Sequence, residues 1–296
     1  MISVVVATYN RLASLRRLVK SVQEQTLPPS AFELIVVDDG STDGTVDLLR
    51  EISEGSKFRF HFLSQENRGP ASARNAGMRH ATGEFVLFTD DDCIPDPDWL
   101  EKVSQFLEAN ADVHGCGGRI VKQRNTPISR YVDRCGAMHH PLSYDGTVDY
   151  LVTANAAYRR EVLEAVRGFC EDISWPGGED PDLSYRVIKH GGRLAYCHDC
   201  IVRHEHRDSL MGLYKMFFNH GRGCACNAHW DAQHNATPCD RFYYYVRIAV
   251  STSRSKNLSM PEKITNFSCG LMRALGFARG VAYQRKQLAT PTRVGV

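Results

Sequence analysis

Three consecutive carboxylates, Asp90, Asp91 and Asp92, are the residues of this chain best placed to do chemistry. They follow the apolar run 84–89 and precede Cys93-Ile94-Pro95, a pattern typical of a buried strand whose carboxyl end carries charge. Parallel α/β sheets bind ligands at those ends, and oxygen ligands suit Mg2+ or Mn2+. The sequence therefore predicts a divalent cation that could hold a diphosphate, with a solvated acidic turn as the structural alternative.

Polar residues also follow the first two apolar runs of the chain. Thr8–Arg11 follow the first run, and Asp38 and Asp39 follow the second. Burying two carboxylates at one strand end costs folding free energy unless they are hydrogen-bonded. The base or ribose of a nucleotide could supply the hydrogen-bond donors. A turn in which aspartate caps the next helix is the alternative.

Strand-like and helix-like segments alternate through the first hundred residues. Strands are expected at 2–7, 32–37, 58–63 and 84–88, and helices around 15–22, 46–49, 71–80 and 99–107. The alternation predicts a doubly wound, mostly parallel sheet with helices on both faces.

The alternation loosens after residue 110. Strands are expected at 113–120, 149–158 and 193–196, and helices at 180–190, 210–218 and, broken near Pro261, from 240 onward. We expect a catalytic domain over 1–225 and a basic, mainly helical extension over 226–296.

The charge is unevenly distributed along the chain. Residues 240–296 hold ten Lys/Arg against two Asp/Glu, whereas the remainder holds 26 against 32, for a net charge of +2. A basic tail favours contact with an anionic surface such as lipid headgroups, and a solvated helical tail is the alternative. No nucleic-acid-binding motif is present, so no nucleic-acid partner is expected.

Location and cysteine state follow from the same sequence. No run approaches the ~20 apolar residues of a membrane span, and the first residues lead directly into a strand. We therefore expect a cytoplasmic protein, and the alternative is a protein bound peripherally to the inner face of the membrane.

The ten cysteines are then expected to be reduced. Clusters of Cys and His at 197–200 and 224–239 match no standard pair of zinc knuckles, which leaves zinc open.

Five motifs resemble those of family 2 glycosyltransferases and stand in the same order, at residues 5–11, 36–43, 67–77, 88–92 and 177–180. That family comprises inverting enzymes of the Rossmann-like GT-A fold that use nucleotide-diphospho-sugar donors. The resemblance covers residues 1–220 and implies an α/β fold, a divalent cation (Mg2+ or Mn2+), and a hexosyltransferase-type activity. The acceptor would be a cell-surface glycan, a lipid-linked saccharide or a small molecule.

The resemblance also implies roles on the donor side of the site. The residues that it places around the nucleotide are Thr8, Tyr9, Asn10, Asp38, Asp39, Arg74, Asp90 and Asp91. Thr8, Tyr9 and Asp39 would contact the base and ribose. Asp90 and Asp92 match the outer positions of the family's Asp-x-Asp motif, and Asp92 is the first choice as metal ligand.

A histidine completes the metal shell in some members of the family. His204 resembles that residue, and His198 and His206 compete with it.

Catalytic residues are implied further along the chain. Asp180, in Glu179-Asp180, matches the base that deprotonates the acceptor hydroxyl, and capping of a helix is its structural alternative.

Asn155 resembles a residue lining the donor-sugar side, and a strand edge is its alternative. Arg222 could pair with the diphosphate, although its neighbouring glycines also suit the end of a helix.

Two rival functions remain at this point. A nucleotidyltransferase should carry a glycine-rich loop after the first strand, and residues 8–12 contain no glycine. A nucleotide-sugar-binding protein without catalysis would not need Glu179-Asp180 and the acidic triplet. Both features favour a glycosyltransferase.

Overall fold

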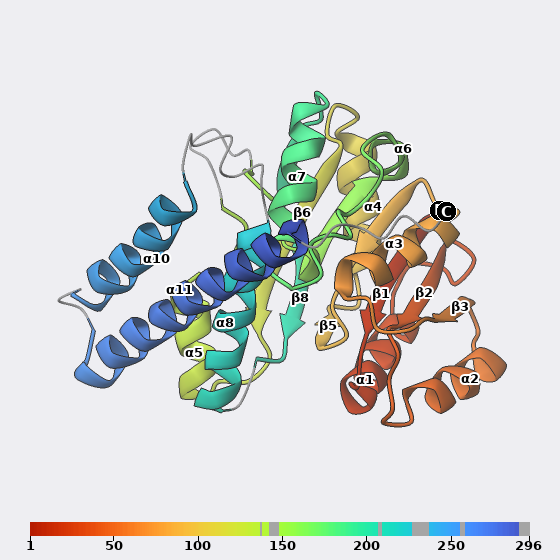
Figure 1. Cartoon of the computed structure of the whole chain (residues 1–296). Coiled ribbons are helices and arrows are strands. Elements are labelled where there is room, and N and C mark those ends of the chain that lie inside the picture. The colour runs from red at the N-terminus through yellow and green to blue at the C-terminus, as the bar shows by residue number, and fades with distance from the viewer. Residues whose placement is uncertain (137, 142–147, 207–208, 227–236, 255–257, 290–296) are drawn as a thin grey trace. The chain divides into compact units, whose positions relative to one another are not determined.

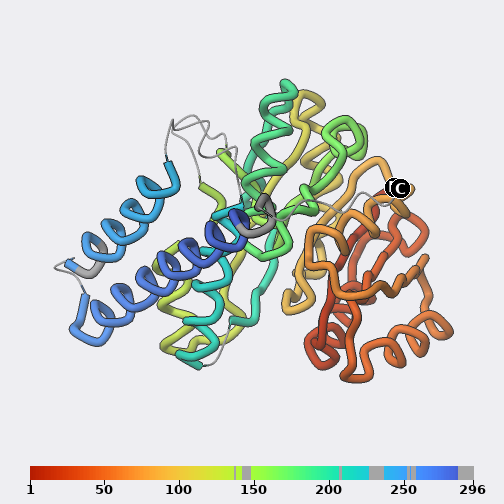
Figure 2. Tube along the Cα trace, viewed as in Figure 1, coloured from red at the N-terminus to blue at the C-terminus, as the bar shows by residue number. Residues whose placement is uncertain are grey.

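The computed structural model describes residues 1–136, 138–141, 148–206, 209–226, 237–254 and 258–289. The chain forms two compact units, one of Met1–Ser174 with Leu183–His206 and the other of Trp175–Asp182 with Arg207–Val296. Figure 1 labels the elements of both units, and Figure 2 traces the chain in the same colours. The expected boundary of a catalytic domain at residue 225 stays a prediction.

One eight-stranded sheet forms the centre of the first unit, in the order β3-β2-β1-β4-β7-β6-β8-β5. Its strands are β1 Ile2–Thr8, β2 Phe32–Asp38, β3 Arg59–Ser64, β4 Phe85–Phe88, β5 Cys93–Pro95, β6 Gly115–Lys122, β7 Ala156–Arg159 and β8 Leu194–His204. Strands β1 to β4 are mutually parallel and β6 is parallel to β8, whereas β7 and β5 run antiparallel to their neighbours. The expected mostly parallel α/β sheet is confirmed.

Helices cover both faces of this sheet. They are α1 Leu12–Gln23, α2 Thr45–Gly55, α3 Pro70–His80, α4 Trp99–Ala109, α5 Pro127–Arg134, α6 Arg160–Ala165 and α7 Glu179–Lys189. Val4 and Val6 of β1 belong to a core with α1, α2 and α4, and Val5, between them, belongs to a second core with α3, α6 and α7. Successive side chains of a strand point to opposite faces, so the apolar run of β1 serves both cores.

The carboxyl ends of β1 and β2 lie level with each other. Thr8 pairs with Asp38 in the parallel register, and the Asp39 N–H donates to the Thr8 carbonyl over 2.9 Å. The two polar strand ends predicted from the sequence are therefore adjacent.

Two expected strands differ from those observed. The segment expected as a strand over 149–158 contains a 3-10 turn, Thr153–Asn155, before β7 begins at Ala156. The strand expected at 193–196 continues to His204, because residues 201–204 pair with residues 119–122 of β6 after a register shift between Gly118 and Arg119. The extra residues form a bulge in β8, and pairing resumes beyond it.

This bulge also corrects the expectation that all cysteines are reduced. Cys197 is the last paired residue before the bulge and Cys200 is the last residue within it; their Cα atoms lie 5.6 Å apart and they form a disulfide. That separation is typical of a disulfide. The spacing in sequence does not reveal the bulge, which depends on pairing with β6.

The second unit contains α8 Leu210–Cys226, α10 Pro238–Ser253 and α11 Met260–Ala289 (Figure 1). Tyr245, Ala274 and Phe277 belong to its core. The expected break near Pro261 is confirmed, because α10 ends at Ser253 and α11 begins at Met260, with Pro261 in its first turn, a position that suits proline. Among the described residues, no helix has the length and apolar character needed to cross a bilayer.

Candidate active site

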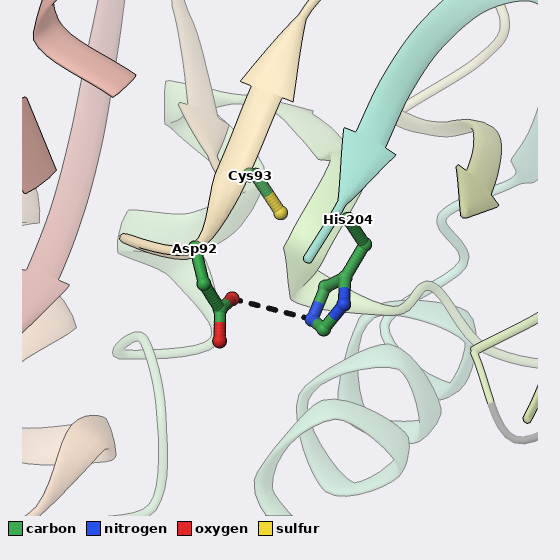
Figure 3. A group of neighbouring side chains, drawn as sticks. All are labelled: Asp92, Cys93 and His204. Carbon is green, nitrogen blue, oxygen red and sulfur yellow. Dashed lines mark ion pairs between the residues drawn. The ribbon is translucent and has the colours of Figure 1, made fainter. Parts of the chain in front are cut away.

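The best candidate for a metal centre joins the start of β5 to the end of β8. His204 pairs with Cys93 in the antiparallel β5–β8 register, which brings the neighbouring Asp92 against the histidine ring. His204 Nε2 lies 3.2 Å from Asp92 Oδ1, and both side chains are almost fully buried. Figure 3 shows the carboxylate and the imidazole facing each other, with the Cys93 thiol beside them.

A second histidine orients His204. The two Nδ1 atoms of His204 and His206 lie 3.0 Å apart. Burial lowers the pKa of His206 to about 4, so at neutral pH its ring is uncharged and can accept a hydrogen bond. With a proton on His204 Nδ1, the lone pair of His204 Nε2 faces Asp92. Metal-binding histidines usually donate their second ring N–H to an acceptor, most often a carboxylate, a backbone carbonyl or water, and here His206 would be that acceptor.

The donor set fits a divalent cation. A carboxylate oxygen and a neutral imidazole nitrogen are suitable ligands for Mn2+, and the carboxylate also suits Mg2+. Burial raises the pKa of the Cys93 thiol well above its ordinary value, so the sulfur stays protonated and is a poor ligand for these ions. Asp92 and His204 are therefore the residues that would hold the cation.

The other two carboxylates of the triplet have different partners. The Arg74 guanidinium lies 2.9 Å from Asp90 and is buried. Thr8 Oγ1 donates to Asp91 over 2.8 Å. Burial, with the nearby Asp92 charge, raises the pKa of Asp91 to about 7. The structure therefore brings each predicted acid next to a different element.

Arg11 is a site residue that the sequence interpretation missed. Its Nη1 lies 3.5 Å from Asp92 Oδ2, so the guanidinium offsets charge beside the candidate metal ligand. The only signal in the sequence was its position directly after Thr8-Tyr9-Asn10 at the first strand end.

Asp39 fixes the loop that leads into α3. Its carboxylate accepts hydrogen bonds from Gln65 Nε2 at 2.8 Å and from the N–H groups of Arg68 and Gly69 at 2.9 Å each. Gly69 has φ +90°, and a Cβ there would lie 2.6 Å from the Ser174 carbonyl oxygen. The buried charge of Asp39 is therefore stabilised by the loop itself.

Asn10 links the first and second strand ends. Its Oδ1 accepts the Thr42 N–H at 2.8 Å, and its own N–H donates to Ser41 Oγ at 2.8 Å. Asp38 accepts the Ser41 N–H at 3.1 Å.

Tyr9 is 49% exposed, which leaves its ring accessible to a planar ligand.

Asn155 connects three elements of the first unit. Its Oδ1 accepts the Trp99 indole N–H at 2.9 Å, and its Nδ2 donates to the carbonyls of Arg119 and Cys200. The side chain is buried. These bonds give Asn155 a structural role joining α4, β6 and β8, and its predicted role in donor binding stays a prediction.

The predicted catalytic acids lie in the second unit. Glu179 Oε2 accepts the N–H groups of Gly177 and Gly178 at 2.6 and 3.0 Å, and Asp180 follows in the first turn of α7. A Cβ on Gly178 would lie 2.2 Å from the Gly223 carbonyl oxygen. Glu179 therefore holds the tight turn from which Asp180 emerges.

Arg222 belongs to the same unit as Asp180. Its guanidinium lies 3.2 Å from the centre of the Trp175 ring, and burial lowers its pKa. The predicted contact with a diphosphate remains a prediction.

The two Cys/His clusters differ in outcome. The disulfide removes Cys197 and Cys200 as zinc ligands. In the second cluster, Cys224 Sγ donates to the Gly177 carbonyl, and His229 and His234 lie outside the described residues.

The first unit also contains a cavity of about 580 Å3 on β6 and β8, lined by both apolar and charged side chains. Arg119, Lys122, Tyr196 and Arg203 contribute to its lining. Lys122 pairs with Asp133 at 2.6 Å. Charged groups beside an aromatic ring make this cavity more suitable for a polar ligand than for an apolar one.

Several known proteins are similar to this chain in sequence. Glycosyltransferase AglE of Haloferax volcanii is 29% identical over 223 residues, which are 75% of this chain and 72% of AglE. The pre-mycofactocin glycosyltransferase of Mycobacterium tuberculosis is 32% identical over 219 residues, 71% of this chain. The chain spans only 43% of the length of that second relative.

Solved structures share the fold. The mannosyltransferase PcManGT from Pyrobaculum calidifontis, in complex with GDP-Man and Mn2+, superimposes with a TM-score of 0.64 at 22% identity, over 98% of this chain and 76% of its own. Staphylococcus aureus TarS 1–349 in complex with UDP-GlcNAc gives a TM-score of 0.56 at 17% identity, over 97% of this chain and 92% of its own. The expected GT-A fold is confirmed.

The model of the family described as "Glycosyl transferase family 2" matches residues 3–167, which is more than half of the chain. This span contains the strand ends that carry Thr8, Asp39 and Asp92. The chain therefore belongs to glycosyltransferase family 2 and is a glycosyltransferase.

Proposed function

We propose that this protein transfers a sugar from a nucleotide-diphospho-sugar to an acceptor hydroxyl, with a divalent cation bound and with inversion at the anomeric carbon. The Asp92–His204 pair carries this proposal, because the 3.2 Å approach of a carboxylate and an imidazole forms a site that suits Mn2+. PcManGT bound to GDP-Man and Mn2+ and TarS bound to UDP-GlcNAc share the fold, which supports a donor of this class.

The donor nucleotide is proposed to bind at the ends of β1 and β2. Tyr9 offers an exposed ring for the base, while Thr8 and Asp39 lie at adjacent strand ends. Arg74 of α3 pairs with Asp90, which follows β4 and is close in sequence to Asp92, the acid proposed to bind the cation. Bound at Asp92 and His204, the cation would offset the negative charge that develops on the departing diphosphate.

Asp180 is proposed as the general base. The hydroxyl proton of the acceptor passes to the Asp180 carboxylate while the oxygen bonds to the anomeric carbon. The bond from that carbon to the donor phosphate breaks, and its electron pair leaves with the nucleoside diphosphate. Attack from the face opposite the leaving group inverts the configuration. Glu179 supports this step by holding the Gly177–Gly178 turn.

The acceptor is proposed to be a glycan, a lipid-linked saccharide or a glycosylated small molecule, in the synthesis of cell-surface polysaccharide or glycoconjugates within the cytoplasm. The cavity on β6 and β8, lined by charged groups such as Arg119 and by the Tyr196 ring, supports a saccharide acceptor. We also propose that the catalytic domain is residues 1–225.

A ligand screen tests the donor proposal. Thermal unfolding would be followed with UDP-, GDP-, dTDP- and CDP-sugars, each with Mn2+, with Mg2+ and with chelator. A donor at a hundredfold excess over its Kd should stabilise the protein by about 2.7 kcal/mol, and only with a metal. Stabilisation that is equal in chelator would overturn metal dependence. NMR of the product's anomeric configuration would test inversion.

A further inference from the structure

One face of α11 exposes apolar side chains along nearly its whole length. We call this face the α11 stripe, and its members are Met260, Ile264, Phe267, Leu271, Leu275, Ala278 and Ala282. Phe267 is 45% exposed and Ile264 is 62% exposed. Steps of three and four residues keep the members on one helical face, and at 1.5 Å per residue the stripe is about 33 Å long.

The α11 stripe is not part of the core of its unit. The inner side of α11 carries Phe277, whose ring lies 5.5 Å from that of Tyr245 in α10. Glycines allow close backbone contact on that side: a Cβ on Gly276 would overlap the Phe218 carbonyl of α8, and one on Gly270 would overlap Ala249 of α10. Packing against α8 and α10 therefore uses the other side of the helix.

Basic residues flank the α11 stripe. Lys263, Arg279 and Arg285 lie on α11 next to the apolar residues, and both arginines are exposed. The two acids of residues 240–296 are engaged at helix starts, where Asp240 accepts the Thr237 N–H and Glu262 accepts the Ser259 N–H, each at 2.8 Å. Basic residues therefore outnumber acidic ones on α11, which contains five Lys/Arg and one Glu.

We propose that the α11 stripe docks on an anionic phospholipid surface, with α11 lying in the plane of the headgroups. An apolar face bordered by Lys and Arg is the pattern of helices that lie in a membrane interface. Tyr243 and Tyr244 of α10 are 69% and 49% exposed, and tyrosine is favoured at that interface.

Charge favours lipid over a second copy of this chain. In a two-fold dimer the same patch of each subunit meets its counterpart. Two stripes packed together would bring the basic borders with Arg279 and Arg285 close to those of the partner, and this repulsion would oppose association. Anionic headgroups would instead neutralise the same charges.

Vesicle flotation of the full chain, without donor or metal, tests this proposal separately from catalysis. The probes are phosphatidylcholine vesicles with and without about a third of phosphatidylglycerol. The wild-type protein should float with the anionic vesicles. The double variant Phe267→Gln/Leu271→Gln should bind at least tenfold more weakly. The control Ile188→Gln, which removes a 43% exposed apolar residue of α7, should bind as the wild type does.

A second variant separates charge from apolar contact. Arg279→Gln should weaken binding to the anionic vesicles about fivefold and leave the far-UV circular dichroism unchanged. Absence of wild-type binding, or equal binding by Phe267→Gln/Leu271→Gln, would overturn the proposal. So would a wild-type dimer in light scattering that the double variant converts to a monomer, because the stripe would then be an interface between copies.

Discussion

Asp92 is the residue on which the proposed metal binding depends most. Its Oδ1 faces the His204 imidazole and its Oδ2 faces the Arg11 guanidinium. One carboxylate therefore contacts both the end of β8 and the segment that follows β1. The acids beside it are already engaged, Asp90 by Arg74 and Asp91 by Thr8. The triplet is therefore three carboxylates in three environments.

Asp92→Ala should abolish most of the effect of Mn2+ on nucleotide binding. Mutation of a residue that only supports a metal ligand typically lowers metal affinity about 10–100-fold. Loss of the ligand itself should lower it at least as much. Calorimetric titration of the nucleotide identified by the donor screen, with Mn2+ and with chelator, measures the change. Asp98→Ala removes a nearby carboxylate that pairs with Lys102 and should leave the Mn2+ effect intact. An unchanged Mn2+ effect in Asp92→Ala would exclude Asp92 as a ligand.

Asp180→Asn should keep donor binding and lower kcat by about 10²–10⁴, the usual contribution of a general base. Glu179→Gln should cost less, because an amide oxygen can still accept the N–H groups of Gly177 and Gly178. Steady-state transfer rates together with donor Kd values distinguish the two roles. Wild-type kcat in Asp180→Asn would remove that residue from the mechanism.

At the scale of elements, the second half of the sheet is held by buried polar side chains. Asn155 joins α4, β6 and β8 through three hydrogen bonds. His140 joins β6 to the segment before β7, with Nε2 at 2.8 Å from the Gly118 carbonyl and Nδ1 accepting the Val152 N–H at 3.0 Å. Both residues occupy irregular segments, where the backbone lacks strand partners.

Asn155→Ala should lower the free energy of unfolding by about 3 kcal/mol, because it leaves the buried Trp99 N–H and two carbonyls unpaired. Urea unfolding monitored by tryptophan fluorescence measures this loss. The control Asn110→Ala removes one partly buried bond, to the Phe106 carbonyl, and should cost no more than about 1 kcal/mol. Equal effects of the two variants would contradict the joining role.

His140 should make the protein less stable in mild acid. Burial lowers its pKa to about 4 in the folded state, from an ordinary value of 6.5. Between these values the unfolded chain binds a proton that the folded chain does not, so stability falls as pH decreases, by about 2 kcal/mol at pH 5. Urea unfolding of the wild type and of His140→Gln at pH 7 and pH 5 should show a smaller pH effect in the variant. Identical pH effects would show that His140 is not the source.

At the scale of the whole molecule, the charges are segregated along the chain. Residues 240–296 carry ten Lys/Arg and two Asp/Glu, and the remainder carries an excess of acids. The predicted donor-binding and metal-binding residues belong to the first unit, except Arg222, whereas the proposed membrane-binding stripe belongs to the second. A lipid-linked acceptor would give this division a function.

Binding to anionic vesicles should therefore depend on salt. The Debye length, over which charges interact in solution, shortens from about 10 Å at 0.1 M salt to about 3 Å at 1 M. Binding to vesicles that contain phosphatidylglycerol should therefore weaken as the NaCl concentration is raised. Any binding to pure phosphatidylcholine should not weaken, because it depends on apolar contact. Flotation that is insensitive to salt on both vesicles would show that the basic border contributes nothing.

Local patterns in the sequence predicted much of the first unit. Strands β1 to β4 and the helices between them were predicted to within a few residues, because apolar runs and helical periodicity are properties of neighbouring residues. Strand β5 and helices α5 and α6 were not predicted. The elements that were missed or shortened depend on distant partners. The 3-10 turn Thr153–Asn155 is stabilised by Trp99, and the full length of β8 depends on pairing with β6.

The sequence by itself determined the α/β class, the order of the first strands and the acids at their ends, and its motifs indicated the family. Only the tertiary structure decided which groups meet: His204 with Asp92, Arg11 with the same carboxylate, and Cys197 with Cys200. The physical reason is that the register between β5 and β8 and the bulge opposite β6 arise from pairing between segments far apart in the chain. The sequence around each of these residues does not indicate which distant strand it will pair with.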